Sequence, residues 1–197
     1  MSKITLIGAG SIMFSRQIIS ALLSSPVLAG SEIILMDLDE QVLARSQRLI
    51  GMMVAQSGVP VTVRHTTDRR SARGADFVIN AIQVGGLAPW RLDMEIPARY
   101  GVIQEVGDTR AGRYLPRPAP YSPMLDILRD MEDLCPQALF INYANPLAPL
   151  TWAAKEASGV RSIGLCYGVR YTVAQLVGYL GLGPWVDHPP RRSAGSA

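Results

Sequence analysis

The sequence has few of the residues that mark secreted or membrane proteins. Its two cysteines, Cys135 and Cys166, cannot build a disulfide framework. No apolar run approaches the roughly 20 residues that a membrane-spanning helix needs. The N-terminus has no hydrophobic signal segment followed by a small-residue cleavage site. We therefore expect a cytoplasmic protein that has no membrane partner.

Lysine is equally scarce, since Lys3 and Lys155 are the only two in 197 residues. The net charge is +3, from 19 basic and 16 acidic residues, and the arginines are scattered along the chain. Nucleic-acid-binding proteins concentrate basic residues on one surface, so we expect no nucleic acid partner. Hydrophobic residues make up 48% of the chain, which excludes a disordered protein and provides enough apolar side chains for a sizeable core.

Short apolar runs alternate with segments of helical periodicity. Strands are predicted at 4–7, 32–36, 61–63, 76–82, 138–142 and 161–166. Helices are predicted at 15–23, from Asp39 through the 50s, from 89 to 100, and at 124–134, 150–157 and 172–180. This alternation predicts an α/β protein with a Rossmann-like, doubly wound, mostly parallel sheet.

The domain is expected to span residues 1–187, because 188–197 contains no large apolar residue and reads as an irregular tail. The segment 107–123 is rich in Gly, Pro and Arg and reads as a long loop, which inside a domain is usually functional. In the helix that Asp39 opens, the expected inward positions are Val42, Leu43, Leu49, Met52 and Met53.

The first candidate site is the loop Gly8-Ala9-Gly10-Ser11 between the first strand and the first helix. Gly8 allows the tight turn, and Gly10 lets the backbone approach a pyrophosphate at the helix N-terminus. Met13 replaces the third glycine of the usual fingerprint. Asp37, at the end of the second strand, is placed to accept the ribose hydroxyls of NAD and to repel a 2′-phosphate. The alternative is a glycine turn with a surface aspartate.

Three further strand ends carry polar or reactive residues. Asn80 and Gly85 follow the fourth strand and are expected to line the cofactor crevice, unless they form only a polar strand end and turn. Asn145 precedes Pro146, which aims its amide into the crevice or makes it the cap of the next helix. Cys166 follows the sixth strand, where it is either a ligand or a buried small hydrophobic residue.

Together these segments resemble glycoside hydrolase family 4, the NAD- and divalent-metal-dependent glycosidases. The matching segments follow the family order: 7–11 with Phe14, 35–39, 75–80, 84–86, 100–104 before Asp108, 142–148, 151–153 and 164–166. The likeness is greatest to α-galactosidases and α-glucosidases that act on non-phosphorylated sugars. Phospho-glycosidases usually have arginine where Gln83 stands.

The resemblance implies hydrolysis of O-glycosyl bonds by oxidation of the sugar at C3 by NAD, elimination, addition of water and re-reduction, outside the usual two-carboxylate scheme. A divalent metal, typically manganese, would polarise the sugar oxygens. Carried over residue by residue, Asp108 and Asn145 would contact the glycoside and Cys166 would bind the metal. Tyr167 stands where the family usually has its acid, a histidine. With a pKa near 10, tyrosine is a poorer proton donor at neutral pH.

The resemblance covers only the cofactor-binding half of the family fold, so we expect the substrate domain to be missing and the chain alone to be inactive. We also expect it to form a homo-oligomer through exposed apolar surface. Two alternatives are a lactate/malate-type NAD-dependent dehydrogenase, which shares this half-fold, and a non-catalytic NAD-binding remnant.

Overall fold

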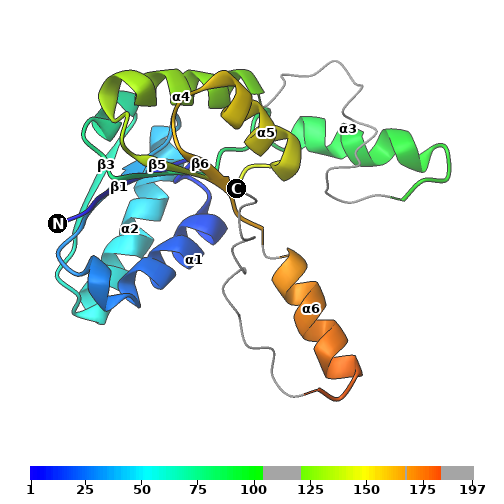
Figure 1. Cartoon of the computed structure of the whole chain (residues 1–197), viewed down its shortest axis with the longest axis horizontal. Coiled ribbons are helices and arrows are strands. Elements are labelled where there is room, and N and C mark those ends of the chain that lie inside the picture. The colour runs from blue at the N-terminus through cyan, green and yellow to red at the C-terminus, as the bar shows by residue number, and fades with distance from the viewer. Residues whose placement is uncertain (104–120, 167, 183–197) are drawn as a thin grey trace, which may run out of the picture. The chain divides into compact units, whose positions relative to one another are not determined.

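A six-stranded parallel sheet organises the computed structural model, which describes residues 1–103, 121–166 and 168–182. The strand order is β3-β2-β1-β4-β5-β6 (Figure 1). Its strands are β1 Lys3–Ile7, β2 Glu32–Met36, β3 Thr62–Thr66, β4 Phe77–Asn80, β5 Leu139–Asn142 and β6 Ser162–Gly164. All five strand pairs are parallel. This topology confirms the predicted Rossmann-like fold.

Helices cover both faces of the sheet. The helices α1 (Ile12–Leu23) and α2 (Glu40–Ser57) lie on one face, and α4 (Tyr121–Leu134) and α5 (Leu147–Ala157) lie on the other (Figure 1). The first unit, Met1–Leu165, also contains α3 (Leu87–Ala98) and the short 3₁₀ helices Pro26–Leu28 and Arg69–Ala72. The second unit begins at Cys166 and contains α6 (Gly168–Tyr179). The domain boundary predicted after 187 lies outside the described residues and stays a prediction.

The pleat of the strands divides the apolar core into two clusters. Ile4 and Leu6 of β1 join the cluster beneath α1 and α2, whereas Ile7 joins the cluster beneath α4 and α5. Successive side chains of a strand point to opposite faces, so a strand covered on both faces must be apolar throughout. The sequence predicted a strand at 32–36 from its continuous apolar run, and β2 occupies these residues with both faces covered.

Helix α2 begins after Asp39 as predicted, but the residues that it turns toward the core are not all the predicted ones. The Asp39 carboxylate caps it by accepting hydrogen bonds from the backbone N–H groups of Gln41 (2.9 Å) and Val42 (3.2 Å). Its buried residues are Leu43, Ser46 and Ile50. Met52 is 58% exposed, so its predicted inward position was wrong. Residue 52 lies two positions past Ile50, about 200° around the helix axis from it.

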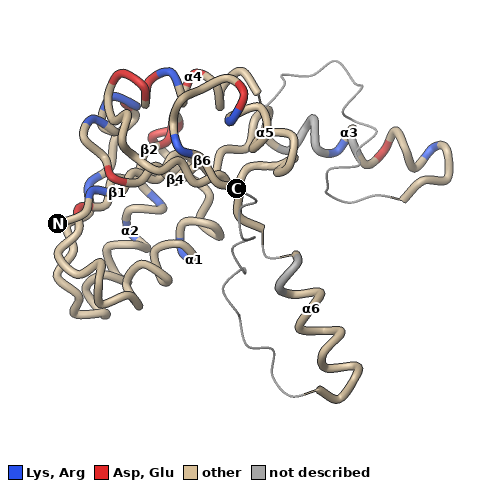
Figure 2. The backbone as a smooth tube through the Cα atoms, in the orientation of Figure 1, with Lys and Arg blue, Asp and Glu red and all other residues tan. Residues whose placement is uncertain are grey.

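Acidic and basic residues both occur along the chain at and near α4 (Figure 2). Arg129 pairs with Asp126 at 2.8 Å and Arg69 with Asp130 at 3.0 Å, in pairs whose side chains remain partly exposed. Exposed pairs of this kind stabilise a fold little. No helix among the described residues combines the length and apolarity needed to cross a bilayer.

The Glu132 carboxylate ties α4 to the turn before β6. It accepts hydrogen bonds from Ser158 Oγ (2.6 Å) and Gly159 N (3.1 Å), and these bonds lower the pKa of Glu132. A carboxyl whose pKa is lower in the folded than in the unfolded chain stabilises the fold above its unfolded pKa. That stabilisation is lost as pH falls through the folded value.

We therefore expect the stability difference between the native chain and Glu132→Gln to be largest near neutral pH and to shrink as the pH falls below the ordinary glutamate range. Urea unfolding measured at a series of pH values tests this. A difference that stays constant down to the most acid pH would contradict the role given to the Glu132 charge.

Candidate functional site

The candidate site lies at the carboxyl edge of the sheet. Because all six strands are parallel, the residues that follow β1, β2, β4 and β5 meet at one edge. The loop Gly8-Ala9-Gly10-Ser11 follows β1 and Asp37 follows β2. Asn80 ends β4, and Asn142 is its register partner at the end of β5. Ligands of open α/β sheets bind at this edge.

Gly8 is required where the first loop touches the chain after β4. Its φ is +87°, and a Cβ there would lie 2.7 Å from the carbonyl carbon and oxygen of Ala81. The backbone of this region is further fixed by Ala81 N–H donating to Ile7 O at 2.8 Å. Both the dihedral angle and the close approach exclude a side chain.

Gly10 meets the Asp37 side chain directly. The Gly10 N–H donates to Asp37 Oδ2 at 2.7 Å, and Asp39 N–H donates to Asp37 Oδ1 at 3.1 Å. A Cβ on Gly10 would lie 2.7 Å from Asp37 Oδ2. Glycine at position 10 therefore makes room for the Asp37 carboxylate as well as for the approach of a phosphate. Asp37 is half-buried, and with two backbone donors on it a carboxylate keeps acceptor sites for hydroxyl groups.

The N-terminus of α1 is left open for an anion. Ser11 is its N-cap residue but makes no side-chain cap hydrogen bond, and the first turn contains no acidic residue. Unpaired N–H groups and the positive end of the helix dipole attract phosphates at such a terminus. The residues around the loop therefore fit a dinucleotide.

Asn80 is wholly buried and belongs to a polar network within the sheet edge. Its Nδ2 donates to Asn142 Oδ1 at 2.8 Å, while its own Oδ1 has no partner. Asn142, 1% exposed, also accepts from Ala144 N–H and donates to Ala144 O, each at 3.2 Å. Asn142 was not among the predicted site residues. The sequence offered a signal for this contact, because β4 and β5 are both apolar strands that end in an asparagine.

Two of the predicted site residues at this edge, Gly85 after β4 and Asn145 after β5, are exposed. Gly85 and Gly86 both have positive φ, 84° and 65°. Asn145 does not cap α5, whose N-cap residue is Pro146 with no side-chain cap bond. The capping alternative for Asn145 is therefore wrong, and its amide is free of that role.

The two cysteines differ in environment. Cys135 is buried, and burial raises the pKa of its thiol. Cys166 is exposed and accepts a hydrogen bond from Gly168 N–H at 3.3 Å, so it is not the buried hydrophobic residue of the alternative reading. The described residues contain no group of three or more His, Cys, Asp and Glu side chains that could hold a metal. Asp108 and Tyr167 lie outside the described residues.

Comparison with known proteins identifies the family. The model of family 4 glycosyl hydrolases matches residues 3–181. An α-galactosidase of Rhizobium meliloti is 42% identical over 182 residues, which are 91% of this chain and 37% of that protein. A 6-phospho-α-glucosidase from gut microorganisms, solved with NAD and Mn²⁺, matches with a TM-score of 0.78 at 18% identity, over 92% of this chain and 42% of that one.

A malate dehydrogenase of Plasmodium falciparum shares the fold at a TM-score of 0.62 and 15% identity, over 93% of this chain and 51% of that one. This likeness shows the common half-fold alone and does not favour the dehydrogenase alternative. The chain spans little more than a third of the Rhizobium relative's length. The family match covers nearly all of the described residues, and the chain belongs to glycoside hydrolase family 4.

Proposed function

We propose that this chain is the cofactor-binding part of an NAD- and divalent-metal-dependent glycosidase that acts on α-galactosides or α-glucosides. The observation that carries the proposal is the Asp37 carboxylate held 2.7 Å from the Gly10 amide at the open N-terminus of α1. The family match and the named α-galactosidase relative support the reaction class. NAD, when bound, supplies the hydride chemistry.

The chain's own residues bind and orient the cofactor in this proposal. Gly8 and Gly10 have no side chain in the loop, and Ser11 is the N-cap residue of α1, whose first N–H groups would bind the pyrophosphate. Asp37 accepts the ribose hydroxyls. Gly85 is exposed after β4, and Asn80, which is wholly buried, fixes the end of β4 through its hydrogen bond to Asn142.

Asp37 is expected to select NAD over NADP. A carboxylate accepts hydrogen bonds from the ribose hydroxyls and repels a 2′-phosphate. Asp37→Ala should weaken NAD binding by about 1–3 kcal/mol, the range for charge-assisted hydrogen bonds. Titration of both cofactors by intrinsic fluorescence measures this. Asp39→Ala is the control, since it removes the neighbouring helix cap and leaves the Asp37 side chain in place. Equal or tighter binding of NADP by the native chain would refute the assignment.

The proposed sugar contacts come from Asn145 and Asp108, by resemblance. Asn145 has an exposed side chain after β5 and is not occupied in capping α5. Replacement of Asn145 should therefore affect sugar binding with little change in NAD binding. Tyr167 is the proposed substitute for the family's acid.

The metal half of the proposal rests on Cys166 alone among the described residues, and this donor set does not fit a tight manganese site. Manganese prefers oxygen and nitrogen ligands and needs a fixed set of them. We expect calorimetry with Mn²⁺ alone to show no micromolar binding. Micromolar binding that Cys166→Ser abolishes, but Cys135→Ser leaves intact, would overturn this expectation.

We further propose that the 197 residues by themselves do not cleave glycosides. The test is incubation with NAD, Mn²⁺, a thiol and p-nitrophenyl α-glycosides, using protein whose mass is verified. Turnover above background that Asp37→Ala reduces would show that these residues suffice. NAD binding without turnover supports the proposal, and absence of NAD binding refutes the cofactor role itself. Cytoplasmic location stays a prediction from the sequence.

A further inference from the structure

Ser15 is a buried serine of α1 whose hydroxyl bonds outside its own helix. It is 1% exposed, and its Oγ donates to Ala9 O at 2.8 Å. Serines within helices often bond the carbonyl three or four residues back. Ser15 instead reaches six residues back, to the loop between β1 and α1. Its hydroxyl therefore fixes the glycine loop rather than the helix.

The peptide unit between Ala9 and Gly10 is held on two sides. Its C=O accepts from the Ser15 hydroxyl, and its N–H donates to Asp37 Oδ2 at 2.7 Å. The peptide bond is trans, so its C=O and N–H point in opposite directions across one rigid plane. The direction that Ser15 gives the C=O is therefore also the direction in which the N–H meets Asp37.

Glycine at position 10 makes this second contact necessary. The N–H groups of Gly8 and Ala9 both donate to Met36 O at 3.0 Å, which fixes the loop as far as Ala9. The next peptide unit is attached to Gly10, which has no Cβ to restrict its rotation. If that unit turned over, the Ala9 C=O would face the Asp37 carboxylate, and two acceptors would repel each other. The Ser15 hydroxyl stabilises the orientation in which they attract.

We propose that Ser15 is a positioning residue for ribose recognition. Its hydroxyl holds the Ala9–Gly10 peptide so that the Gly10 N–H keeps the Asp37 carboxylate in place for the ribose hydroxyls. In a chain of hydrogen bonds each bond polarises and strengthens the next. Ser15 thereby supports the preference for NAD over NADP without touching the cofactor. The inference rests on the cofactor role proposed above and adds a residue to it.

Titration with NAD and NADP tests this role. Ser15→Ala removes one hydrogen bond, so it should raise the dissociation constant of NAD about three- to tenfold. The ratio of the NADP to the NAD dissociation constant should fall by a similar factor, because Asp37 discriminates between the two. A general loosening of the loop would weaken both cofactors alike and leave the ratio unchanged. Ser15→Thr keeps a hydroxyl and should keep the native ratio.

A double-mutant cycle shows whether Ser15 acts through Asp37. In an Asp37→Ala background, Ser15→Ala should produce no further change in the ratio, since the group that it positions is gone. Residues that act through one shared contact are non-additive in this way.

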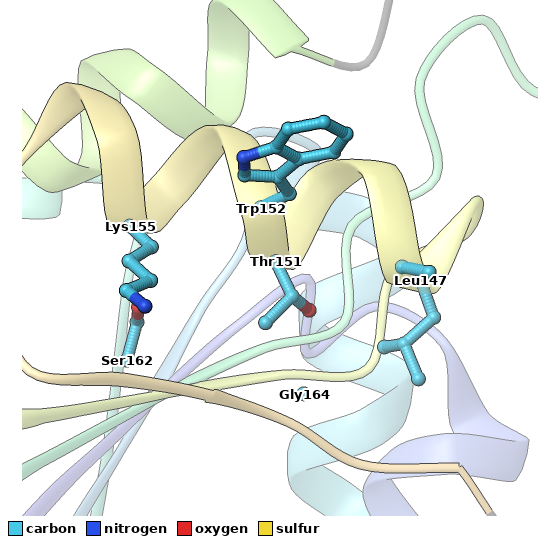
Figure 3. Close-up of a pocket in the computed structure, with 7 residues that line it drawn as sticks. Leu147, Thr151, Trp152, Lys155, Ser162 and Gly164 are labelled. Atoms are coloured by element: carbon cyan, nitrogen blue, oxygen red, sulfur yellow. The ribbon is translucent and has the colours of Figure 1, made fainter.

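Two other hydroxyls in helices provide matched controls. Ser46 of α2 is 0% exposed, and its Oγ has no hydrogen-bond partner among the described residues. Thr151 of α5 also has a buried, unpartnered Oγ1, and it lines a hollow of about 410 Å³ between α5 and β6 (Figure 3). Ser46→Ala and Thr151→Val remove buried hydroxyls that hold no loop, so both should leave the ratio at its native value.

Amide hydrogen exchange tests the peptide without any cofactor. In Ser15→Ala the Gly10 N–H should exchange about three- to tenfold faster than in the native chain, because its bond to Asp37 opens more often. The Ala81 N–H, which donates to Ile7 O at 2.8 Å, should keep its native rate. This comparison also separates a local change from a loss of global stability.

The outcomes distinguish this inference from the proposed function. A native chain that binds no NAD refutes the cofactor role and the inference that rests on it. The inference fails by itself if NAD binds but Ser15→Ala leaves the cofactor ratio or the Gly10 exchange rate at its native value. It also fails if the change in ratio persists in the Asp37→Ala background, or if Ser15→Thr behaves like Ser15→Ala.

Discussion

Gly8→Ala should lower the free energy of unfolding by about 2–5 kcal/mol. A φ of +87° costs a residue with a Cβ about 1–2 kcal/mol. A further 1–3 kcal/mol, roughly, comes from forcing a Cβ to within 2.7 Å of the Ala81 backbone. Ala81 is itself bonded to Ile7 O, so neither segment can move away without breaking the β1–β4 junction. Urea unfolding of both proteins gives the difference.

Gly58→Ala is the matched control for this prediction. Gly58 ends α2 with a φ of +65°, and nothing lies within 4 Å of a Cβ placed on it. The substitution therefore carries the same dihedral cost of about 1–2 kcal/mol and no collision. If the two variants lost equal stability, the close approach of the Gly8 loop to Ala81 would have no energetic weight.

Asn142→Ala should destabilise the fold by about 2–4 kcal/mol, because it leaves buried polar groups without partners at roughly 1–3 kcal/mol each. The Asn80 amide would lose its acceptor, and the Ala144 N–H would lose the Asn142 oxygen. Asn142 is 1% exposed, so water does not replace these bonds readily. Chemical denaturation measures the loss.

Asn145→Ala serves as the control within the same motif. Its side chain is exposed, and an exposed substitution usually changes stability by less than about 0.5 kcal/mol. The pair of variants separates the asparagine that holds the sheet edge together from the one proposed to contact the sugar. Comparable destabilisation by both would show that Asn145 has a structural role that its exposure does not suggest.

Strand positions were predictable where burial on both faces made the sequence apolar throughout, as in β2. The Asp39 cap was predictable as well, because an N-cap acts within a few residues of itself. The set of α2 residues that faces the core was not predictable in this way. Ile50 was overlooked and Met52 wrongly included, since the orientation of a helix is set by what it packs on.

Asn80 shows the same limit within the candidate site. A polar residue at a strand end was expected to line the crevice, but in the fold it is wholly buried on Asn142. That contact joins residues 62 positions apart and exists only because β4 and β5 are neighbours in register.

The sequence by itself determined the fold class, the glycine loop, the acid that follows β2 and the family, because each of these is recorded in residues close together in the chain. Only the tertiary structure decided that Gly10 bonds to Asp37, that Asn142 supports Asn80, and that β6 is the outer strand of the described sheet. These depend on strand order and register, which bring distant residues within hydrogen-bonding distance. Local sequence patterns do not encode that proximity.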